Sequence, residues 1–97
     1  MRKLGIVRSV ALTATAAQIV GPSEQRAALL FSPPTAGGVT YTVSTEPGVA
    51  LGAGLNLSST TGPLLLTEER FGDAVKKPWF AIASTTLTIG FLETIVD

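Results

Sequence analysis

Short apolar segments separated by turn residues make up the pattern of this chain. The clearest is residues 39–44, where Val39, Tyr41 and Val43 alternate with threonine and serine, a period of two that is typical of a half-buried strand. No apolar run approaches the roughly 18 residues that a membrane-spanning helix requires. About eight such segments predict an all-β fold, a small antiparallel sandwich or barrel. The expected strands cover residues 4–12, 13–20, 26–32, 39–44, 49–57, 63–66, 79–84 and 87–96.

The first twelve residues form a strand pattern with one interruption. Every second position from residue 4 is apolar except Arg8, and the apolar positions are Leu4, Ile6, Val10 and Leu12. The same region resembles a secretory signal that ends in an Ala-Thr-Ala cleavage site at residues 14–16, but Arg8 interrupts its apolar region. We therefore assign residues 1–12 to an N-terminal strand or arm, and residues 13–97 to a single β-sandwich domain.

The stretch of residues 62–84 predicts one helical turn between two strands. Thr67 is placed to cap the turn and Gly72 to end it, and Leu66 and Phe71 take the two positions of a hydrophobic staple. One turn is too short to be stable alone, so packing must hold it. The residues expected in the structural core are Leu66, Phe71, Trp79 and Ile82.

Two connections can be assigned from the turn residues. Residues 79–84 are expected to pair with residues 87–96 as a hairpin across Thr85 and Thr86, because neighbours in sequence usually pair in space. Pro47-Gly48 suits a type II turn with Gly48 at the position that needs a positive φ. Residues 49–57 then form one strand that bends at Gly52 and Gly54.

Charge and composition narrow the classes of function. The chain has a net charge of zero and 14% charged residues, against about 25% in typical soluble domains. This gives no footprint for nucleic acid or an anionic membrane, and the three cations Arg2, Lys3 and Arg8 would bind nucleic acid only weakly. With no Cys and no His, the chain lacks the usual ligands of zinc and haem and most nucleophile and base pairs. We expect no cofactor, no metal and no enzyme, and a charge-poor surface favours association.

Candidate binding groups have simpler structural explanations. Glu68, Glu69 and Asp73 carry hard oxygen ligands, but their spacing fits no calcium loop and the first two suit the start of a helix. Trp79 and Tyr41 could form an aromatic platform for a sugar or a peptide. A lone tryptophan flanked by apolar residues is more often a core residue, so the burial of Trp79 decides between the two interpretations.

Several short motifs from about Thr13 to Glu93 resemble one known group of proteins. They are the threonine- and alanine-rich lead ending in Gln-Ile-Val at residues 18–20, the Arg-Ala-Ala-Leu-Leu-Phe strand at residues 26–31, and the segments at residues 66–75 and 78–82. In this order they are similar to the small β-sandwich virion structural proteins of tailed bacteriophages. The sequence departs from that pattern in two places. Residues 21–25 read Gly-Pro-Ser-Glu-Gln where the pattern would have an Asn-Pro type of turn, and the final strand is longer.

The resemblance implies a capsid decoration (cement) protein, or a small head or tail accessory, located on the virion. Its partner would be the major capsid protein, and it would assemble as a homo-oligomer, with a trimer favoured. The expected partner interface is the N-terminal arm, resting on a neighbour through Leu4, Ile6, Val7 and Arg8. A carbohydrate- or receptor-binding module that uses Trp79 and Tyr41 is the alternative.

Overall fold

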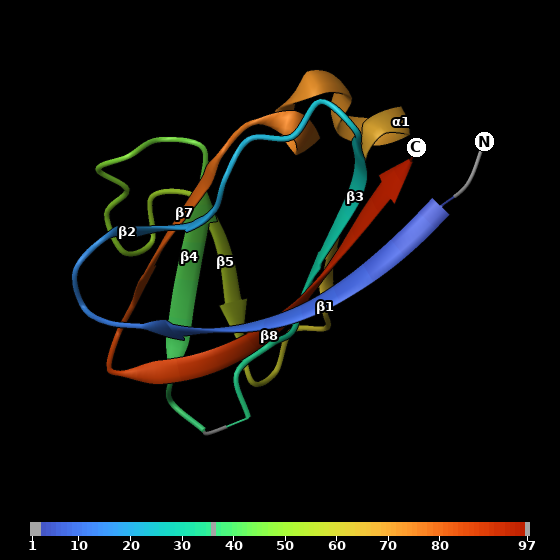
Figure 1. Cartoon of the computed structure of the whole chain (residues 1–97). Coiled ribbons are helices and arrows are strands. Elements are labelled where there is room, and N and C mark those ends of the chain that lie inside the picture. The colour runs from blue at the N-terminus through green and yellow to red at the C-terminus, as the bar shows by residue number, and fades with distance from the viewer. Residues whose placement is uncertain (1–2, 36, 97) are drawn as a thin grey trace.

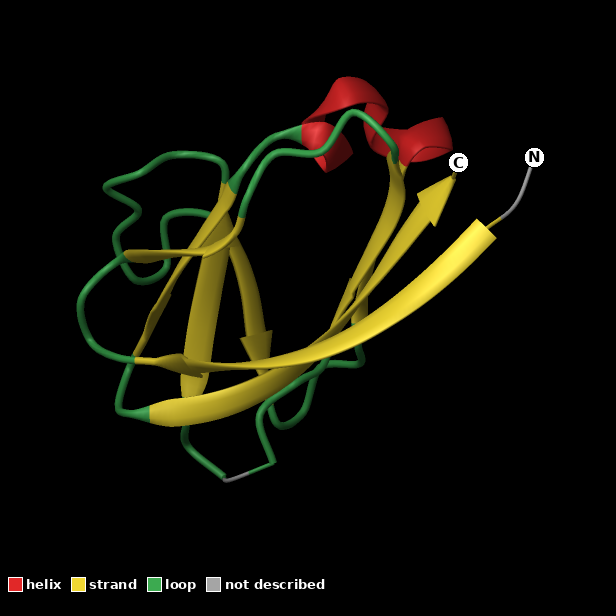
Figure 2. Cartoon of the chain, viewed as in Figure 1, coloured by secondary structure: helices red, strands yellow, loops and turns green. Residues whose placement is uncertain are grey.

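The computed structural model of the chain describes residues 3–35 and 37–96, which form two antiparallel sheets of four strands each. The predicted all-β sandwich is therefore confirmed (Figure 1, Figure 2). The first sheet, sheet A, has the strand order β1-β8-β3-β6, and sheet B has the order β2-β7-β4-β5. The strands are β1 (Lys3–Leu12), β2 (Ala17–Val20), β3 (Arg26–Phe31), β4 (Thr40–Ser44), β5 (Leu55–Ser58), β6 (Leu64–Thr67), β7 (Trp79–Ala83) and β8 (Leu87–Val96).

The core lies between the two sheets. Every second residue of a strand points inward, so sheet A contributes Leu29, Phe31 and Phe91, while sheet B contributes Tyr41 and Trp79. The Phe31 ring lies 6.2 Å from that of Trp79 and 6.0 Å from that of Phe91, measured between ring centroids, in tilted arrangements. The contact of Phe31 with Trp79 joins the two sheets across the core, while Phe31 and Phe91 are paired neighbours within sheet A.

The N-terminal segment is a strand of the sandwich, because β1 pairs with β8 along its whole length without a bulge. Paired residues of antiparallel strands share a face, so Val10 pairs with the inward-facing Ile89, and Leu12 with Leu87. The two strands continue together past sheet B, and Figure 1 shows the start of β1 and the end of β8 at the same end of the molecule, near α1. The molecule is accordingly elongated, with extents of 41 × 24 × 21 Å.

The predicted helical turn exists, but its staple does not. The helix α1 (Glu68–Phe71) follows β6 and continues into a 3-10 helix, η1 (Gly72–Lys76), through Gly72 at a φ of 62°. Thr67 precedes α1 without a side-chain cap hydrogen bond. Leu66 is buried in the core, whereas Phe71 is 44% exposed, so the expectation of a buried Phe71 is wrong. Leu66 belongs to β6 and points between the sheets, while no residue of α1 is buried.

The expected hairpin of residues 79–84 and 87–96 is also wrong, because β7 belongs to sheet B and β8 to sheet A. The connection between them crosses from one sheet to the other. Two-residue hairpin turns of the favoured types need a residue with positive φ. Threonine resists that conformation, and the described residues with positive φ are all glycines.

The segment between β4 and β5 is a loop rather than the first half of a bent strand. Pro47 and Gly48 do form a turn, but Gly48 does not have a positive φ, so the turn is not of the type II expected there. The positive φ belongs instead to Gly52, at 86°, and the Ala53 N–H donates to the Ala50 carbonyl at 2.9 Å. This is the geometry of a type II turn displaced by four residues from the predicted position.

Candidate assembly surface

The four residues expected to form the partner interface lie on two different faces of β1. Leu4, Ile6 and Arg8 pair with inward-facing positions of β8, so they point toward the space between the sheets. Val7 points to the opposite side and is 78% exposed. The structure therefore separates Val7 from the other three, and the single surface expected from the sequence divides into an outer face and an inner cleft.

An apolar row crosses the outer face of sheet A from one edge to the other. Val7 pairs with Leu92, Leu92 with Leu30, and Leu30 with Leu65. Paired residues share a face, so these four side chains stand side by side on four adjacent strands. Leu92 and Leu30 are half-buried, and Leu65 is 54% exposed at the far edge. We call this set the outer row.

Small and uncharged residues flank the outer row. The neighbouring row contains Gly5, Thr94, Ala28 and Thr67, all paired in register. At the α1 end, Glu68 and Glu69 border a hollow that Ala28, Thr67 and Thr94 also line. The face thus has an apolar centre with its carboxylates at the rim, which is the arrangement found in protein interfaces.

Part of the outer face of sheet B is covered by the chain itself. Thr42 points outward from the middle of β4, yet it is buried because the loop between β4 and β5 lies over it. The Gly52 N–H donates to Thr42 Oγ1 at 2.9 Å, and the Thr42 hydroxyl donates to Asn56 Oδ1 at 2.6 Å. Val49, in the same loop, is also buried, but it does not belong to the core that lies between the sheets. This loop therefore closes part of the face of sheet B.

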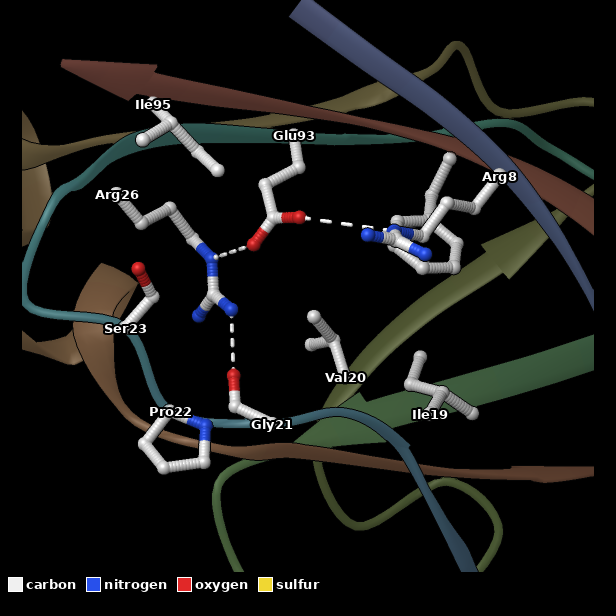
Figure 3. A pocket seen from close by; sticks show the side chains of 10 residues that line it. Arg8, Ile19, Val20, Gly21, Pro22, Ser23, Arg26, Glu93 and Ile95 are labelled. Carbon is white, nitrogen blue, oxygen red and sulfur yellow. Dashed lines mark hydrogen bonds and ion pairs between the residues drawn. The ribbon is translucent and has the colours of Figure 1, made fainter. Parts of the chain in front are cut away.

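The inner cleft is organised by a buried ion pair (Figure 3). Arg26 is 1% exposed, and its Nε donates to Glu93 Oε2 at 2.7 Å. Its Nη1 donates to the carbonyls of Val75 at 2.9 Å and Lys77 at 3.1 Å, and its Nη2 donates to the Gly21 carbonyl. One guanidinium thereby connects β3, β8, η1 and the segment after β2, which fixes the separation of the sheets at this end.

Arg8 borders the mouth of the same cleft, which has a volume of about 370 Å³. Its Nε lies 3.8 Å from Glu93 Oε1, and its side chain is largely exposed. Arg8 is therefore a solvated cation at the rim, whereas Arg26 is part of the structure. Sequence reasoning treated Arg26 only as the start of a strand and missed its partner 67 residues away. The sequence feature that could have revealed the ion pair is Glu93, because this charged residue lies on the same inward face of its strand as Ile89 and Phe91.

The aromatic platform does not exist on the surface. Trp79 is 4% exposed, and its Nε1 donates to the Ala74 carbonyl at 3.1 Å. Tyr41 is completely buried and donates its hydroxyl to the Ser32 carbonyl, and burial raises the pKa of the Tyr41 phenol. Ile82 points outward from sheet B and is only half-buried, so its assignment to the core is wrong, whereas Leu66 and Trp79 do lie in the core.

Among residues 3–35 and 37–96, the carboxylates do not gather into a group that could hold a metal ion. Glu68, one of the three considered for calcium, instead forms an ion pair with Lys76, with 2.7 Å between Oε2 and Nζ. This contact, together with the coulombic attraction of Glu68, raises the pKa of the Lys76 amine. In the same described part of the chain, no helix has the length and apolar character that a membrane crossing demands.

No protein family matches the chain, and no curated protein sequence matches it. One solved structure is similar in fold, that of Bacillus endospore appendages described as a novel family of disulfide-linked pili. The TM-score is 0.56, with 16% sequence identity, and the match covers 97% of this chain and 84% of the other. At this identity the likeness establishes the shared β fold and nothing more.

Proposed function

We propose that this protein is a virion structural protein of a tailed bacteriophage, a decoration protein that binds the major capsid protein and stabilises the head. The resemblance of its sequence motifs suggests the class. The observation that carries the proposal is the outer row, an apolar line across a sheet face that the described residues leave uncovered, on a chain with zero net charge. In this account the protein acts by burying surface and performs no catalysis.

The outer face of sheet A suits attachment to a protein shell. Its centre is apolar and its rim carries carboxylates, so burial of the outer row stabilises the contact while the rim stays in water. It is also rigid, since β8 and β3 are each paired on both sides. A preorganised face loses little conformational entropy on binding.

A subunit of a fibre is the second candidate, because the structural neighbour comes from pili. Those pili are described as disulfide-linked, whereas this chain contains no cysteine. Any fibre built from it would need contacts of another kind between copies. The carbohydrate- or receptor-binding alternative would need residues other than Trp79 and Tyr41, because both are buried.

The test is binding to heads that lack the protein, purified from a phage strain in which its gene is deleted. Purified protein should sediment with these heads. Leu65→Asp should weaken binding at least about a hundredfold, since burying an unpaired carboxylate costs several kcal/mol. The control is Leu51→Asp, which changes a leucine of similar exposure on the loop over sheet B and should bind normally.

Equal loss of binding in both variants would contradict the assignment of the face. Failure of the unmodified protein to sediment with heads would contradict the decoration function. Sedimentation of the protein alone as long polymers would favour the fibre subunit instead.

A further inference from the structure

We infer that two copies of this chain pair through the free edges of their β1 strands, which joins their sheets A into one antiparallel sheet of eight strands. The inference adds a partner, a second copy, to the proposed assembly function. It needs no shell, so it can be tested on the protein alone.

The edge of β1 is open within the described residues. Within the described residues β1 has β8 as its only neighbour in the sheet. It is ten residues long, whereas the other edge strands, β2, β5 and β6, have four residues each. Proteins usually block a long edge with proline, a bulge or several charges. β1 contains no proline or bulge, and its charges are Lys3 at its start and Arg8 at its centre.

The hydrogen bonds of β8 show which residues of β1 point their backbone N–H and carbonyl groups toward the free edge. The Val96 N–H donates to the Gln25 carbonyl at 2.8 Å, and the Gly90 carbonyl accepts from the Ser32 N–H at 3.1 Å. Even-numbered residues of β8 therefore direct their backbone groups toward β3, and odd-numbered ones direct theirs toward β1.

The odd residues of β8 pair with the even residues of β1, so the odd residues of β1 point their N–H and carbonyl groups away from the sheet. Gly5, Val7 and Ser9 are thus the centre of an unused ladder. The ladder ends after residue 11, where the Thr13 carbonyl accepts from the Ala83 N–H of sheet B at 2.9 Å.

One register makes this ladder self-complementary. A two-fold axis at Val7 pairs Val7 with its own copy and Gly5 with Ser9 of the second copy, and it uses the edge from residue 3 to residue 11. Inward-facing Arg8 then lies opposite Ile6. An axis at Arg8 would place two guanidinium groups opposite each other, and an axis at Ile6 would shorten the ladder by two residues.

The Val7 register also joins the two outer rows. Val7 ends the row at the edge of each sheet, so the paired copies carry one continuous line of eight apolar side chains. Two-fold pairing predicts a dimer in place of the trimer that the sequence resemblance favours, because an isologous edge contact closes after two copies.

The experiment measures the mass of the purified full chain in solution by sedimentation equilibrium. We expect twice the chain mass of 10.0 kDa. Ser9→Pro removes an outward N–H and leaves the bonds to β8 intact, so it should give a folded monomer. A wild-type monomer or trimer would overturn the inference and leave attachment to the shell untouched.

The register has its own test, which also decides the matter if Ser9→Pro fails to fold. The chain has no cysteine, so Val7→Cys introduces a single thiol. In the Val7 register two such thiols face each other on adjacent strands, within the Cα separation of about 4.4–6.8 Å that a disulfide spans. Mild oxidation should convert Val7→Cys to a covalent dimer and leave Leu65→Cys, on the opposite edge, uncrosslinked. Equal crosslinking of both variants would overturn the β1 pairing.

Discussion

The outer faces of the two sheets differ in how far the chain itself covers them. Part of the outer face of sheet B is covered by the loop between β4 and β5, in which the Gly52 N–H donates to the hydroxyl of Thr42 and Val49 is buried outside the core. In the described part of the chain nothing comparable covers the outer row of sheet A, and its edge residues Leu65 and Val7 are more than half exposed. Both faces carry apolar side chains, so burial within the monomer distinguishes the structural face from the face available to a partner.

The largest expected effect comes from the ion pair that holds both sheets in position. Arg26→Met should destabilise the fold by about 3–5 kcal/mol, because it leaves Glu93 buried without its partner and removes four hydrogen bonds. The measurement is chemical unfolding at neutral pH. Arg8→Met is the matched control, and its largely exposed side chain predicts a change below about 1 kcal/mol. Equal losses would show that Arg8 is part of the same structural network.

A smaller loss of stability should follow from displacing the loop that lies over sheet B. A Cβ atom added at Gly54 would lie 2.7 Å from the Val43 carbonyl oxygen, which is backbone and cannot move aside cheaply. Gly54→Ala should therefore cost about 1–3 kcal/mol. Gly48→Ala, in the same loop with open space around it, should be within about 0.5 kcal/mol of the wild type. A neutral Gly54→Ala would mean that the loop only rests on sheet B.

The smallest change in stability is expected from substitution of Phe71, an exposed aromatic residue beside sheet A. Phe71→Ala should change stability by less than about 0.5 kcal/mol, whereas Leu66→Ala should cost about 2–5 kcal/mol. It should also leave shell binding unchanged, because Phe71 lies on α1 and outside the outer row. Loss of binding in Phe71→Ala would extend the attachment surface beyond the sheet face.

The sequence was sufficient to predict the fold class and most of the strands. Period-two alternation in residues 39–44 identifies Tyr41 and Val43 as the positions that face the core, and glycine and proline mark where strands stop. It failed where a local pattern has more than one tertiary solution. Phe71 fits a staple by spacing, but the four-residue helix is held away from the core. Likewise, two neighbouring strands joined by Thr85 and Thr86 can form a hairpin or cross between sheets.

The candidate surface was harder to predict, because it depends on register. In the sequence Leu30 and Leu65 lie within the apolar runs of residues 26–32 and 63–66, which predict buried strands, so nothing marks them as outward-facing. Only the pairing of the four strands aligns them with Val7. The ion pair of Arg26 and Glu93 could likewise be predicted only from the pairing of β3 with β8, since 67 residues separate its members.

We propose that the apolar outer row of sheet A, and not the scattered cations, attaches the protein to its particle. The most direct measurement is occupancy on purified heads as sodium chloride rises from about 0.1 M to about 1 M, where the Debye length falls from about 10 Å to about 3 Å. Burial of apolar surface does not weaken under these conditions, so we predict that occupancy persists at molar salt. Progressive release along the series would contradict the account and would assign attachment to cations such as Arg8, Lys76 and Lys77.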